Sequence, residues 1–547
     1  MNRVVDAVVI GSGHNGLVAA AYLARAGWSV EVLERAERAG GAVTTEELTL
    51  PGFRHDTFSS WHPLFMGSAA YAELGPELEQ RGLRYVNTDV PTGVAYGDGH
   101  AVVAARDPQR TVEGFNAADA AAFLAELGRF GAIADVIGEL LSSELHAPRT
   151  AGRLLALGRR LGARGSLAAA AFSVQSARGW LESTFTGPEP GLLYAPWVLH
   201  TGLEPSAAGG ALQLVALAGG LHAGGMPVVE GGSERFVTAL ERLVADHGGA
   251  VRTGVDAEEI RVAGGRATGV VAAGELVEAR RAVVASVTPP QLYGRLLAGH
   301  LAAAGADAPA APAAEEARRF RFGRGAMQVH VALSEPLRWR DSRLDTAAVV
   351  HVADGPAAVD LACAQAAAGQ LPARPTVVCG QPCTVDPSRA PEGQAILWIQ
   401  LQEVPYAPVA DAAGELDTAG GWTPELAGAY ADRVLARIAE HAPNLPGAVL
   451  GRAILTPVDI ERRNVNLQGG DPYAGAAHLD QALPWRPLPG YGSHRTPVDG
   501  LWQIGASTHP GPGLNAASGR MVARRLIAGD GGLGAAARRI RGRVGRS

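Results

Sequence analysis

The 547 residues predict an α/β fold in which three distant stretches of the chain build one nucleotide-binding domain. Residues 6–34 have the pattern of a strand, a glycine turn, a helix and a second strand. Residues 226–285 have a glycine pair, a helical pattern and a strand meander, and residues 501–527 have a strand, a glycine-rich turn and a helical pattern. The remaining chain predicts a second domain of mixed sheet and helix.

The first stretch opens with a short apolar run, residues 6–10, and a helical pattern follows over residues 17–27. The turn between them has the spacing GxGxxG, formed by Gly11, Gly13 and Gly16. In this spacing the first glycine permits a tight turn, the second lets the backbone approach a pyrophosphate, and the third lets helix and strand pack closely. Because the helix N-terminus faces negative charge, the pattern predicts a Rossmann-like dinucleotide site.

An acidic residue and a second glycine pair extend this site. Residues 28–33 predict a second strand, and Glu34 follows 18 residues after Gly16, where it can accept hydrogen bonds from both ribose hydroxyls. The motif alone leaves open whether the dinucleotide carries nicotinamide or flavin. The doublet Gly40–Gly41 lets the chain fold back over the pyrophosphate, which resembles the extended flavin-binding pattern of the large flavoprotein oxidoreductases, although Ala42 replaces the arginine usual there.

FAD is therefore the predicted cofactor, and the C-terminal glycine turn is expected to meet its anion or flavin carbonyl with a second helix N-terminus. The predicted cofactor-binding residues are Gly11, Ser12, Gly13, Asn15, Gly16, Glu34, Arg35, Gly40, Gly41, Ala42, Ala257, Gly505, Ala506, Gly513, Leu514 and Asn515.

Composition excludes several function classes. The formal charge of −6 excludes a basic whole-protein footprint for nucleic acid. All 48 basic residues are arginine, and the lack of lysine excludes Schiff-base, pyridoxal phosphate and P-loop lysine chemistry. Three cysteines clustered late in the chain form neither a disulfide framework nor a four-ligand zinc site, so we predict no metal and a cytoplasmic location. No run of 18 apolar residues exists, so no transmembrane helix is expected.

The domain boundaries follow from these stretches. Residues 1–95, 226–300 and 490–547 are assigned to the FAD-binding domain, and residues 96–225 and 301–489 to the substrate domain. Strand character in that second domain lies at residues 327–333, 346–352 and 395–402, which we expect to form a sheet roofing the flavin.

A helical, arginine-punctuated stretch lies within the substrate domain at residues 117–185. Its alanine and leucine background allows two interpretations. One is a helix at a membrane surface, which would make the protein peripheral to the membrane, and the other is a solvated helix face. A second group of arginines lies in the tail at residues 538–546, where we expect an unstructured terminus.

Taken together, the motifs resemble the phytoene-desaturase-like flavoproteins, and within them the branch of pyridine nucleotide–disulfide oxidoreductase domain proteins. The most specific segments are VVIGSGHNGLVAAAYLARAG at 8–27, MPVVEGGSERFVTAL at 226–240 and GASTHPGPGLNAASGR at 505–520. The resemblance implies an FAD domain, a substrate domain akin to that of amine oxidases, and two-electron chemistry on hydrophobic, often polyene-like substrates next to a membrane. This chain has Asp471, Pro472 and Tyr473 where relatives often carry a histidine. It also lacks the lysine that often holds a water at the flavin of amine oxidases.

Flavin chemistry requires no dedicated nucleophile, because the cofactor carries the reaction and the protein positions the substrate. The candidate catalytic residues are Asp56 and His62, which follow the PGF turn, Arg486 and His509. For each, the alternative is a structural polar residue with satisfied hydrogen bonds. His330 alternates with valines along a strand and is interpreted as structural.

Three functions stay open from the sequence. The first is an FAD-dependent desaturase, dehydrogenase or oxidase acting on an apolar polyene or terpenoid-like molecule, with oxygen, a quinone or NAD(P) as electron acceptor. The second is a secondary-metabolite tailoring enzyme that uses NADPH-reduced flavin for reductive cyclisation. The third is a non-enzymatic lipid carrier of the same fold, which the intact glycine and Glu34 pattern disfavours.

Overall fold

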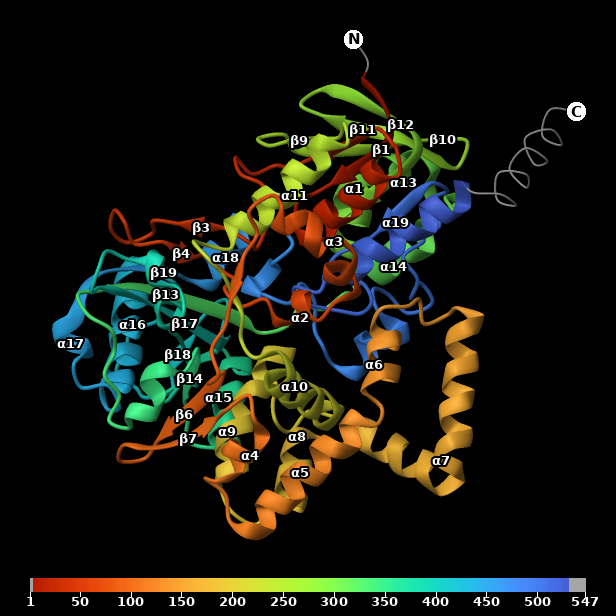
Figure 1. Cartoon of the computed structure of the whole chain (residues 1–547). Coiled ribbons are helices and arrows are strands. Elements are labelled where there is room, and N and C mark those ends of the chain that lie inside the picture. The colour runs from red at the N-terminus through yellow and green to blue at the C-terminus, as the bar shows by residue number, and fades with distance from the viewer. Residues whose placement is uncertain (1–2, 531–547) are drawn as a thin grey trace, which may run out of the picture.

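The computed structural model describes residues 3–530, which form two large sheets surrounded by helices (Figure 1). The first sheet lies at the top of the view and the second at its lower left. The mixed α/β fold class predicted from the sequence is confirmed. The predicted basic tail at residues 538–546 lies outside the described residues.

The first sheet has the strand order β10–β11–β12–β1–β2–β9, and β20 also pairs with β12. Its strands are β1 (Arg3–Ile10), β2 (Val30–Leu33), β9 (Ala250–Arg252), β10 (Ala257–Ala263), β11 (Arg266–Ala272), β12 (Glu275–Ala285) and β20 (Leu501–Gln503). The strands β20, β12, β1, β2 and β9 run parallel, whereas β10, β11 and β12 form an antiparallel meander. Three stretches of chain therefore meet in this sheet.

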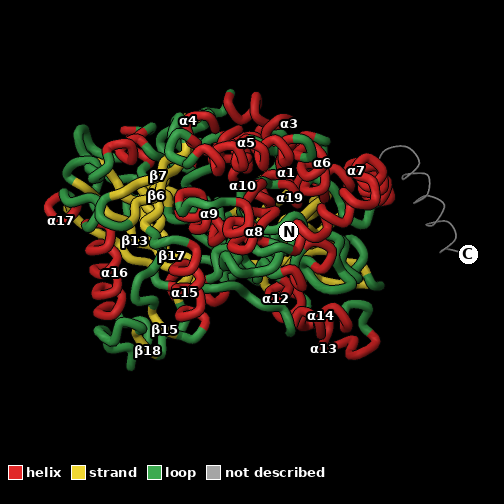
Figure 2. Tube along the Cα trace, turned by 90° about the horizontal axis from the view of Figure 1, so that it is seen from below, coloured by secondary structure: helices red, strands yellow, loops and turns green. Residues whose placement is uncertain are grey.

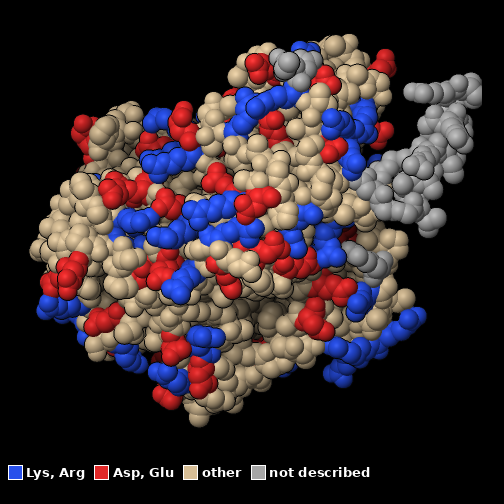
Figure 3. All heavy atoms as spheres, turned by 45° about the horizontal axis from the view of Figure 1, so that its top comes forward, with Lys and Arg blue, Asp and Glu red and all other residues tan. Residues whose placement is uncertain are grey.

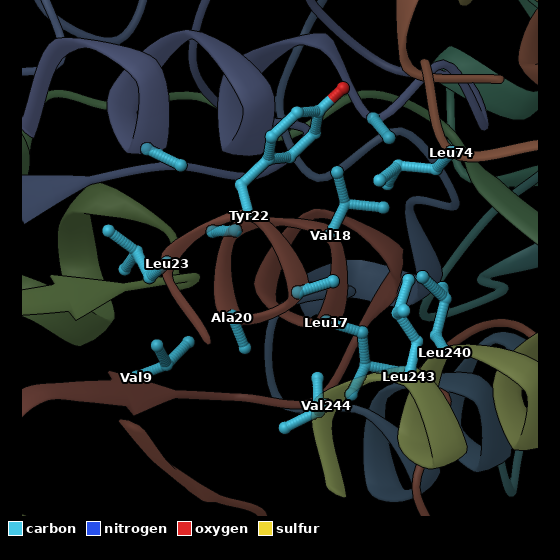
Figure 4. Close-up of a cluster of buried hydrophobic side chains, with 14 of the residues drawn as sticks. Val9, Leu17, Val18, Ala20, Tyr22, Leu23, Leu74, Leu240, Leu243 and Val244 are labelled. Carbon is cyan, nitrogen blue, oxygen red and sulfur yellow. The ribbon is translucent and has the colours of Figure 1, made fainter. Parts of the chain in front are cut away.

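Helices α1 (His14–Arg25) and α11 (Glu234–Asp246) pack on one face of the first sheet, and α3 (Ala69–Glu79) and α19 (Ala517–Asp530) pack against these two helices. Leu17 and Leu23 of α1 are fully buried against β1, α3 and α11, and Figure 4 shows Leu240, Leu243 and Val244 of α11 beside Leu17. Both faces of β1 are apolar, because a parallel sheet is covered on both sides. The other face packs against α14 (Ala311–Arg318) and neighbouring turns.

The second sheet has the strand order β19–β13–β17–β16–β14–β6–β7. Its strands are β6 (Thr92–Tyr96), β7 (His100–Ala104), β13 (Gly325–Leu333), β14 (Val349–Val352), β16 (Val377–Gly380), β17 (Ala395–Val404) and β19 (Val449–Leu455). The predicted strand at 346–352 begins only at Val349, because residues 342–346 form a 3₁₀ turn. One face of the sheet packs on α16 (Pro424–Ala439).

A helical region covers part of the other face of the second sheet. It contains α5 (Ala117–Gly131), α6 (Ala134–Leu141), α7 (Pro148–Val174), α8 (Ala177–Thr184), α9 (Glu189–Val198) and α10 (Gly210–Gly224). Seen from below in Figure 2, α9 lies beside β6 and β7, and α8 and α10 pack against α9. Figure 1 shows α7 extending away from the body. Within residues 3–530 no helix is both long and apolar enough to cross a membrane.

Candidate dinucleotide site

The predicted nucleotide loop lies at the carboxyl ends of the parallel strands. Ile10, at the end of β1, pairs in register with Leu33 of β2 and Ala285 of β12. The chain turns directly afterwards at Gly11, whose φ is +90°. Ligands of open parallel sheets bind at this edge, where strand ends and helix N-termini meet.

Two glycines of the motif have different steric surroundings. A Cβ at Gly16 would lie 2.0 Å from the carbonyl oxygen of Gly11, so no side chain fits there. Gly13 is the N-cap of α1, and no atom lies within 4 Å of its Cβ position. This space lies at the N-terminus of α1, whose free backbone N–H groups and helix dipole attract a phosphate.

The second glycine pair closes one side of this loop. Gly40 forms a parallel bridge with Gly13, and its N–H donates a hydrogen bond to Ser12 Oγ at 3.1 Å. A Cβ at Gly41 would lie 3.1 Å from the Cα of Gly13, which leaves little room for a larger residue. Both glycines have positive φ, +122° at Gly40 and +62° at Gly41.

Glu34 is buried at the end of β2 and its carboxylate is held by three donors. Ser12 donates to Oε2 from its backbone N–H at 2.9 Å and its hydroxyl at 2.8 Å, and Ala36 N–H donates to Oε1 at 2.9 Å. A carboxylate has about four lone-pair positions. One position on Oε1 is therefore free for a ribose hydroxyl.

Asn15 joins the C-terminal segment to this loop. Its Oδ1 accepts hydrogen bonds from Ser518 Oγ at 2.8 Å and from Gly519 N–H at 3.2 Å. Ser518 Oγ in turn accepts from the N–H of Gly505 at 3.0 Å. The side chain of Asn15 thus holds the N-terminus of α19 beside that of α1, although Asn15 and Ser518 lie 503 positions apart in the chain.

The C-terminal turn lies beside the loop. Asn515 Oδ1 accepts a hydrogen bond from Ala517 N–H at 2.8 Å, and Ala516 has a φ of +57°. The helix expected within residues 501–527 consequently begins only at Ala517. A Cβ at Gly513 would lie 2.6 Å from Leu64, and Leu514 packs into the core of the first sheet.

Three further predicted cofactor residues are Arg35, Ala42 and Ala257. Arg35 is exposed directly after Glu34, and Ala42 is half-buried after the second glycine pair. Ala257 begins β10 and packs in the same core cluster as Leu33. No contact of these side chains tests their predicted role, which stays a prediction.

Asp56 lies in a buried ionic network. Its Oδ1 accepts hydrogen bonds from Thr45 Oγ1 at 2.6 Å and Ser233 N–H at 2.9 Å, and its Oδ2 accepts from Ser60 Oγ at 2.7 Å and Arg389 at 2.8 Å. Burial opposes the charged form, but the Arg389 guanidinium and these donors hold the pKa of Asp56 below its ordinary value. With both oxygens engaged, Asp56 stabilises the loops that carry it.

Arg389 is fully buried and connects two carboxylates. Its Nη1 donates to Asp56, its Nε donates to Asp386 at 2.6 Å, and its Nη2 donates to the carbonyl of Val229 at 2.8 Å. Asp386 also accepts from Gly231 N–H at 2.7 Å, which fixes the glycine pair before α11. Sequence reasoning missed Arg389 because it lies 333 positions from Asp56.

His62 is buried beside this network and both ring nitrogens have partners. Nδ1 lies 3.0 Å from Tyr85 Oη, and Nε2 lies 3.3 Å from Ser233 Oγ. Burial lowers the pKa of His62 to about 3, so its imidazole is neutral at neutral pH. Its predicted catalytic role stays untested, and the structure gives it a positioning role.

Arg486 connects the C-terminal turn to the loop at residues 471–481. Its guanidinium is buried, and its N–H groups donate to backbone carbonyls, including Ala506 at 2.8 Å and Ala476 at 3.0 Å. Burial lowers its pKa to about 10. Asp471, which the sequence singled out only as a departure from relatives, accepts hydrogen bonds from the backbone N–H groups of Tyr473 and Gly475 in the same loop and of Gly323. Arg486 therefore holds the turn through its backbone.

His509 lies between the C-terminal turn and the helical region. Its Nε2 donates to the carbonyl of Leu140 at 2.9 Å, and its own carbonyl lies 3.0 Å from Nε2 of His494. Burial lowers the pKa of His509 to about 4. The predicted catalytic residues are thus distributed over separate networks, and only Asp56 and His62 share one, through Ser233.

The residues of the glycine loop fit a bound dinucleotide. The open Cβ position at Gly13, the helix N-terminus and the free acceptor of Glu34 match a pyrophosphate and a ribose. These features define a dinucleotide-binding protein of the Rossmann class.

Comparison with known proteins gives the family. The sequence pattern of the family of flavin-containing amine oxidoreductases matches residues 16–527, and the chain belongs to this family. It is an FAD-dependent oxidoreductase. The predicted FAD cofactor and the predicted enzyme class are confirmed.

Individual relatives extend this result. The chain is 30% identical to pyridine nucleotide-disulfide oxidoreductase domain-containing protein 2 of Rattus norvegicus, over 95% of this chain and 92% of that protein. It is 28% identical to one of the limonene dehydrogenase subunits of Castellaniella defragrans, over 96% and 95% respectively. It is also 28% identical to the zeta-carotene-forming phytoene desaturase of Myxococcus xanthus, over 54% and 52%. The predicted resemblance is confirmed.

Solved structures support the fold. An oxidoreductase from Methanosarcina mazei has a TM-score of 0.61 at 16% identity, and the match covers 95% of this chain and 99% of that one.

Proposed function

We propose that this enzyme transfers hydride between FAD and an apolar small molecule of polyene or terpenoid type. The observation that carries the proposal is the packing around the C-terminal turn. Ala506 lies in an apolar cluster with Phe58, Ala326, Leu467 and Ala474, so the turn predicted to hold flavin adjoins apolar side chains of the second domain. The names of the limonene dehydrogenase and phytoene desaturase relatives support a terpenoid substrate.

In this proposal the chain positions groups and excludes water, while bound FAD supplies the two-electron chemistry. Arg486 fixes the backbone at Ala506, and the Asp56–Arg389 network fixes the loops around Gly231. Both ring nitrogens of the neutral His62 and both carboxylate oxygens of Asp56 already have hydrogen-bond partners.

The test begins with the purified protein and its flavin absorbance. Anaerobic addition of limonene, or of a longer polyene, is expected to bleach the oxidised flavin band. Oxygen, a quinone and NAD(P)⁺ are then added separately to identify the acceptor that restores the band. Bleaching by NADPH and reoxidation by a polyene would instead favour reductive cyclisation, and a colourless protein would favour the lipid carrier.

Two substitutions test the cofactor site. Gly13→Glu places a side chain and a negative charge at the phosphate position, and Glu34→Ala removes the acceptor of three hydrogen bonds. Both variants are expected to lose most bound FAD, measured as the ratio of flavin to protein absorbance. Gly128→Glu, at an exposed helical glycine with no atom within 4 Å, is the matched control and is expected to retain it. Full flavin occupancy in both site variants would refute the assignment.

We also propose that α7 contacts an anionic membrane surface. Residues 148–174 contain five arginines and no acidic residue, and Leu154, Leu155 and Leu167 are 50%, 56% and 73% exposed. Such a helix combines apolar burial with attraction to anionic headgroups. On the face shown in Figure 3, many of the basic side chains have acidic side chains next to them. Co-sedimentation with anionic but not zwitterionic vesicles is the expected result, and binding to neither kind of vesicle would contradict it.

A further inference from the structure

A buried polar surface lies on the second sheet at β13 and β17. Gln328 of β13 pairs in register with Gln400 of β17, and Gln402 lies two residues further along the same face. Trp398 lies two residues before Gln400 on that face. We call these four residues the amide face. Their exposed fractions are 1%, 8%, 4% and 5% in the order Gln328, Gln400, Gln402 and Trp398.

Three polar atoms of the amide face have no hydrogen-bond partner. They are Oε1 of Gln328, Oε1 of Gln402 and Nε1 of Trp398. The amide nitrogen of Gln402 is engaged, since it donates to Gln400 Oε1 at 3.0 Å and to Tyr473 Oη at 2.9 Å. A buried polar group without a partner costs about 1–3 kcal/mol, so such groups are expected to meet a ligand or an ordered water.

The amide face adjoins the turn predicted to hold flavin. Ala326, two residues before Gln328 on β13, packs in one apolar cluster with Ala506. Tyr473, which binds Gln402, has its carbonyl 3.4 Å from an Arg486 nitrogen that also donates to Ala506. The unpartnered oxygens of Gln328 and Gln402 therefore lie close to the site of the proposed reaction, and Trp398 lies further along the same face of β17, against Trp61.

The chemistry of these atoms selects a ligand group. Two amide oxygens accept and one indole N–H donates, so a hydroxyl can satisfy both kinds of atom. A carbonyl or an ether only accepts and would leave the amide oxygens unpaired. An apolar hydrocarbon would leave all three unpaired.

The charged groups near the amide face, Glu403 and Arg324, are already engaged, and His330, which pairs in register with Trp398, is neutral because burial lowers its pKa to about 3. Glu403 points to the opposite face of β17 and accepts hydrogen bonds from Thr376 N–H at 2.6 Å and Gln402 N–H at 3.1 Å. Arg324 forms an ion pair with Glu204 at 2.6 Å. An ammonium or carboxylate of a ligand would therefore be buried without a counter-charge, which is costly.

We propose that the substrate of this enzyme carries a neutral hydroxyl group, which the amide face binds by accepting its proton at Gln328 or Gln402 and donating from Trp398. This inference rests on the proposed function, because it takes the apolar region beside Ala506 as the place of reaction. It narrows the substrate class from terpenoid hydrocarbons to terpenoid alcohols.

The test measures binding without turnover. The flavin-containing protein is dialysed to equilibrium under argon against limonene, perillyl alcohol or perillaldehyde, which share one carbon skeleton, and the bound compound is quantified by gas chromatography. The alcohol is expected to bind about tenfold more tightly than the hydrocarbon, and more tightly than the aldehyde. Equal binding of alcohol and hydrocarbon, tighter binding of the aldehyde, or no binding of any compound would overturn the inference.

Two variants locate the effect. Gln328→Met and Gln402→Met keep the side-chain length but remove the amide, so the variant at the glutamine that accepts the hydroxyl proton is expected to lose most of the preference for the alcohol. Gln80→Met, at an exposed position after α3, is the matched control and keeps the preference. Retention of the preference in both site variants would overturn the inference.

The flavin content of each variant separates the possible failures. If Gln328→Met and Gln402→Met lose flavin absorbance while Gln80→Met retains it, the amide face binds the cofactor and the inference is wrong. If the alcohol preference is present but no terpenoid reduces the flavin, the proposed function fails and the hydroxyl site stands.

Discussion

At the scale of single residues, Arg389 shows how one buried charge holds together the loops that carry Asp56, Asp386 and Gly231. It has no exposed surface, and it pairs with Asp56 and Asp386, which are themselves buried. Through these partners it fixes Ser233 and Gly231 at the start of α11. Removing one partner of a buried ion pair destabilises the folded protein, because the remaining buried charge then has no counter-charge.

We expect Arg389→Met to destabilise the protein by about 3–5 kcal/mol at neutral pH. Without the guanidinium, the lowered pKa values of Asp56 and Asp386 rise, and two buried carboxylates repel each other. The deficit relative to wild type is expected to shrink as pH falls, since the carboxylates of the variant then become protonated. Urea unfolding at about pH 7.5 and about pH 5 measures both effects.

The control for this variant is Arg338→Met. The Arg338 side chain is 73% exposed and pairs with Glu335 on the surface, so its loss is expected to change stability by less than about 0.5 kcal/mol. An Arg389→Met protein as stable as this control would contradict a structural role for the buried pair.

At the scale of secondary-structure elements, the crossing of α1 and α19 defines the two helix N-termini of the site. A Cβ at Gly519 would lie 2.1 Å from the carbonyl oxygen of Asn15. The two helices can approach this closely only because residue 519 is glycine. Asn15 and Ser518 then complete the contact through their side chains.

We expect Gly519→Ala to cost about 1–3 kcal/mol of stability and to lower flavin occupancy, because the added methyl group separates the two helices. Thermal unfolding and the flavin absorbance ratio measure the two effects. Gly220→Ala in α10 is the matched control, since no atom lies within 4 Å of its Cβ position. That control is expected to gain about 0.5–1 kcal/mol, and a Gly519→Ala protein that behaves like it would show that the close crossing is unimportant.

At the scale of the whole molecule, buried neutral histidines connect stability to pH. Desolvation lowers the pKa to about 3 at the buried His62 and His330 and at the half-buried His200, and to about 4 at the buried His55 and the half-buried His14. In the unfolded chain histidine titrates near about 6.5. The unfolded state therefore binds more protons than the folded state between these values.

We expect full histidine-derived stabilisation above about pH 6.5, and its progressive loss as pH falls toward about 4. The buried carboxylates with lowered pKa, such as Asp56, add a further loss at lower pH. Scanning calorimetry across this range is expected to show a melting temperature that decreases steadily below about pH 6.5. A melting temperature constant down to about pH 5 would contradict neutral buried histidines.

The sequence alone determined the fold class, the predicted dinucleotide loop and the three stretches that meet in the first sheet. These depend on short-range patterns: glycine spacing at Gly11–Gly16, an acid at Glu34, and apolar periodicity within single strands and helices. Such patterns are readable because each is required by its own local backbone geometry or burial.

Only the tertiary structure decided which groups the polar side chains contact. Asp56 and Arg486 are candidates for chemistry, and the contact of Asp56 with Arg389 and that of Arg486 with the carbonyl of Ala506 show that both also support the backbone. The amide face was invisible in the sequence, because a glutamine along an apolar strand gives no sign of which residues lie opposite it. Partners distant in the chain, together with burial, determine whether such a side chain is satisfied or left to bind a ligand.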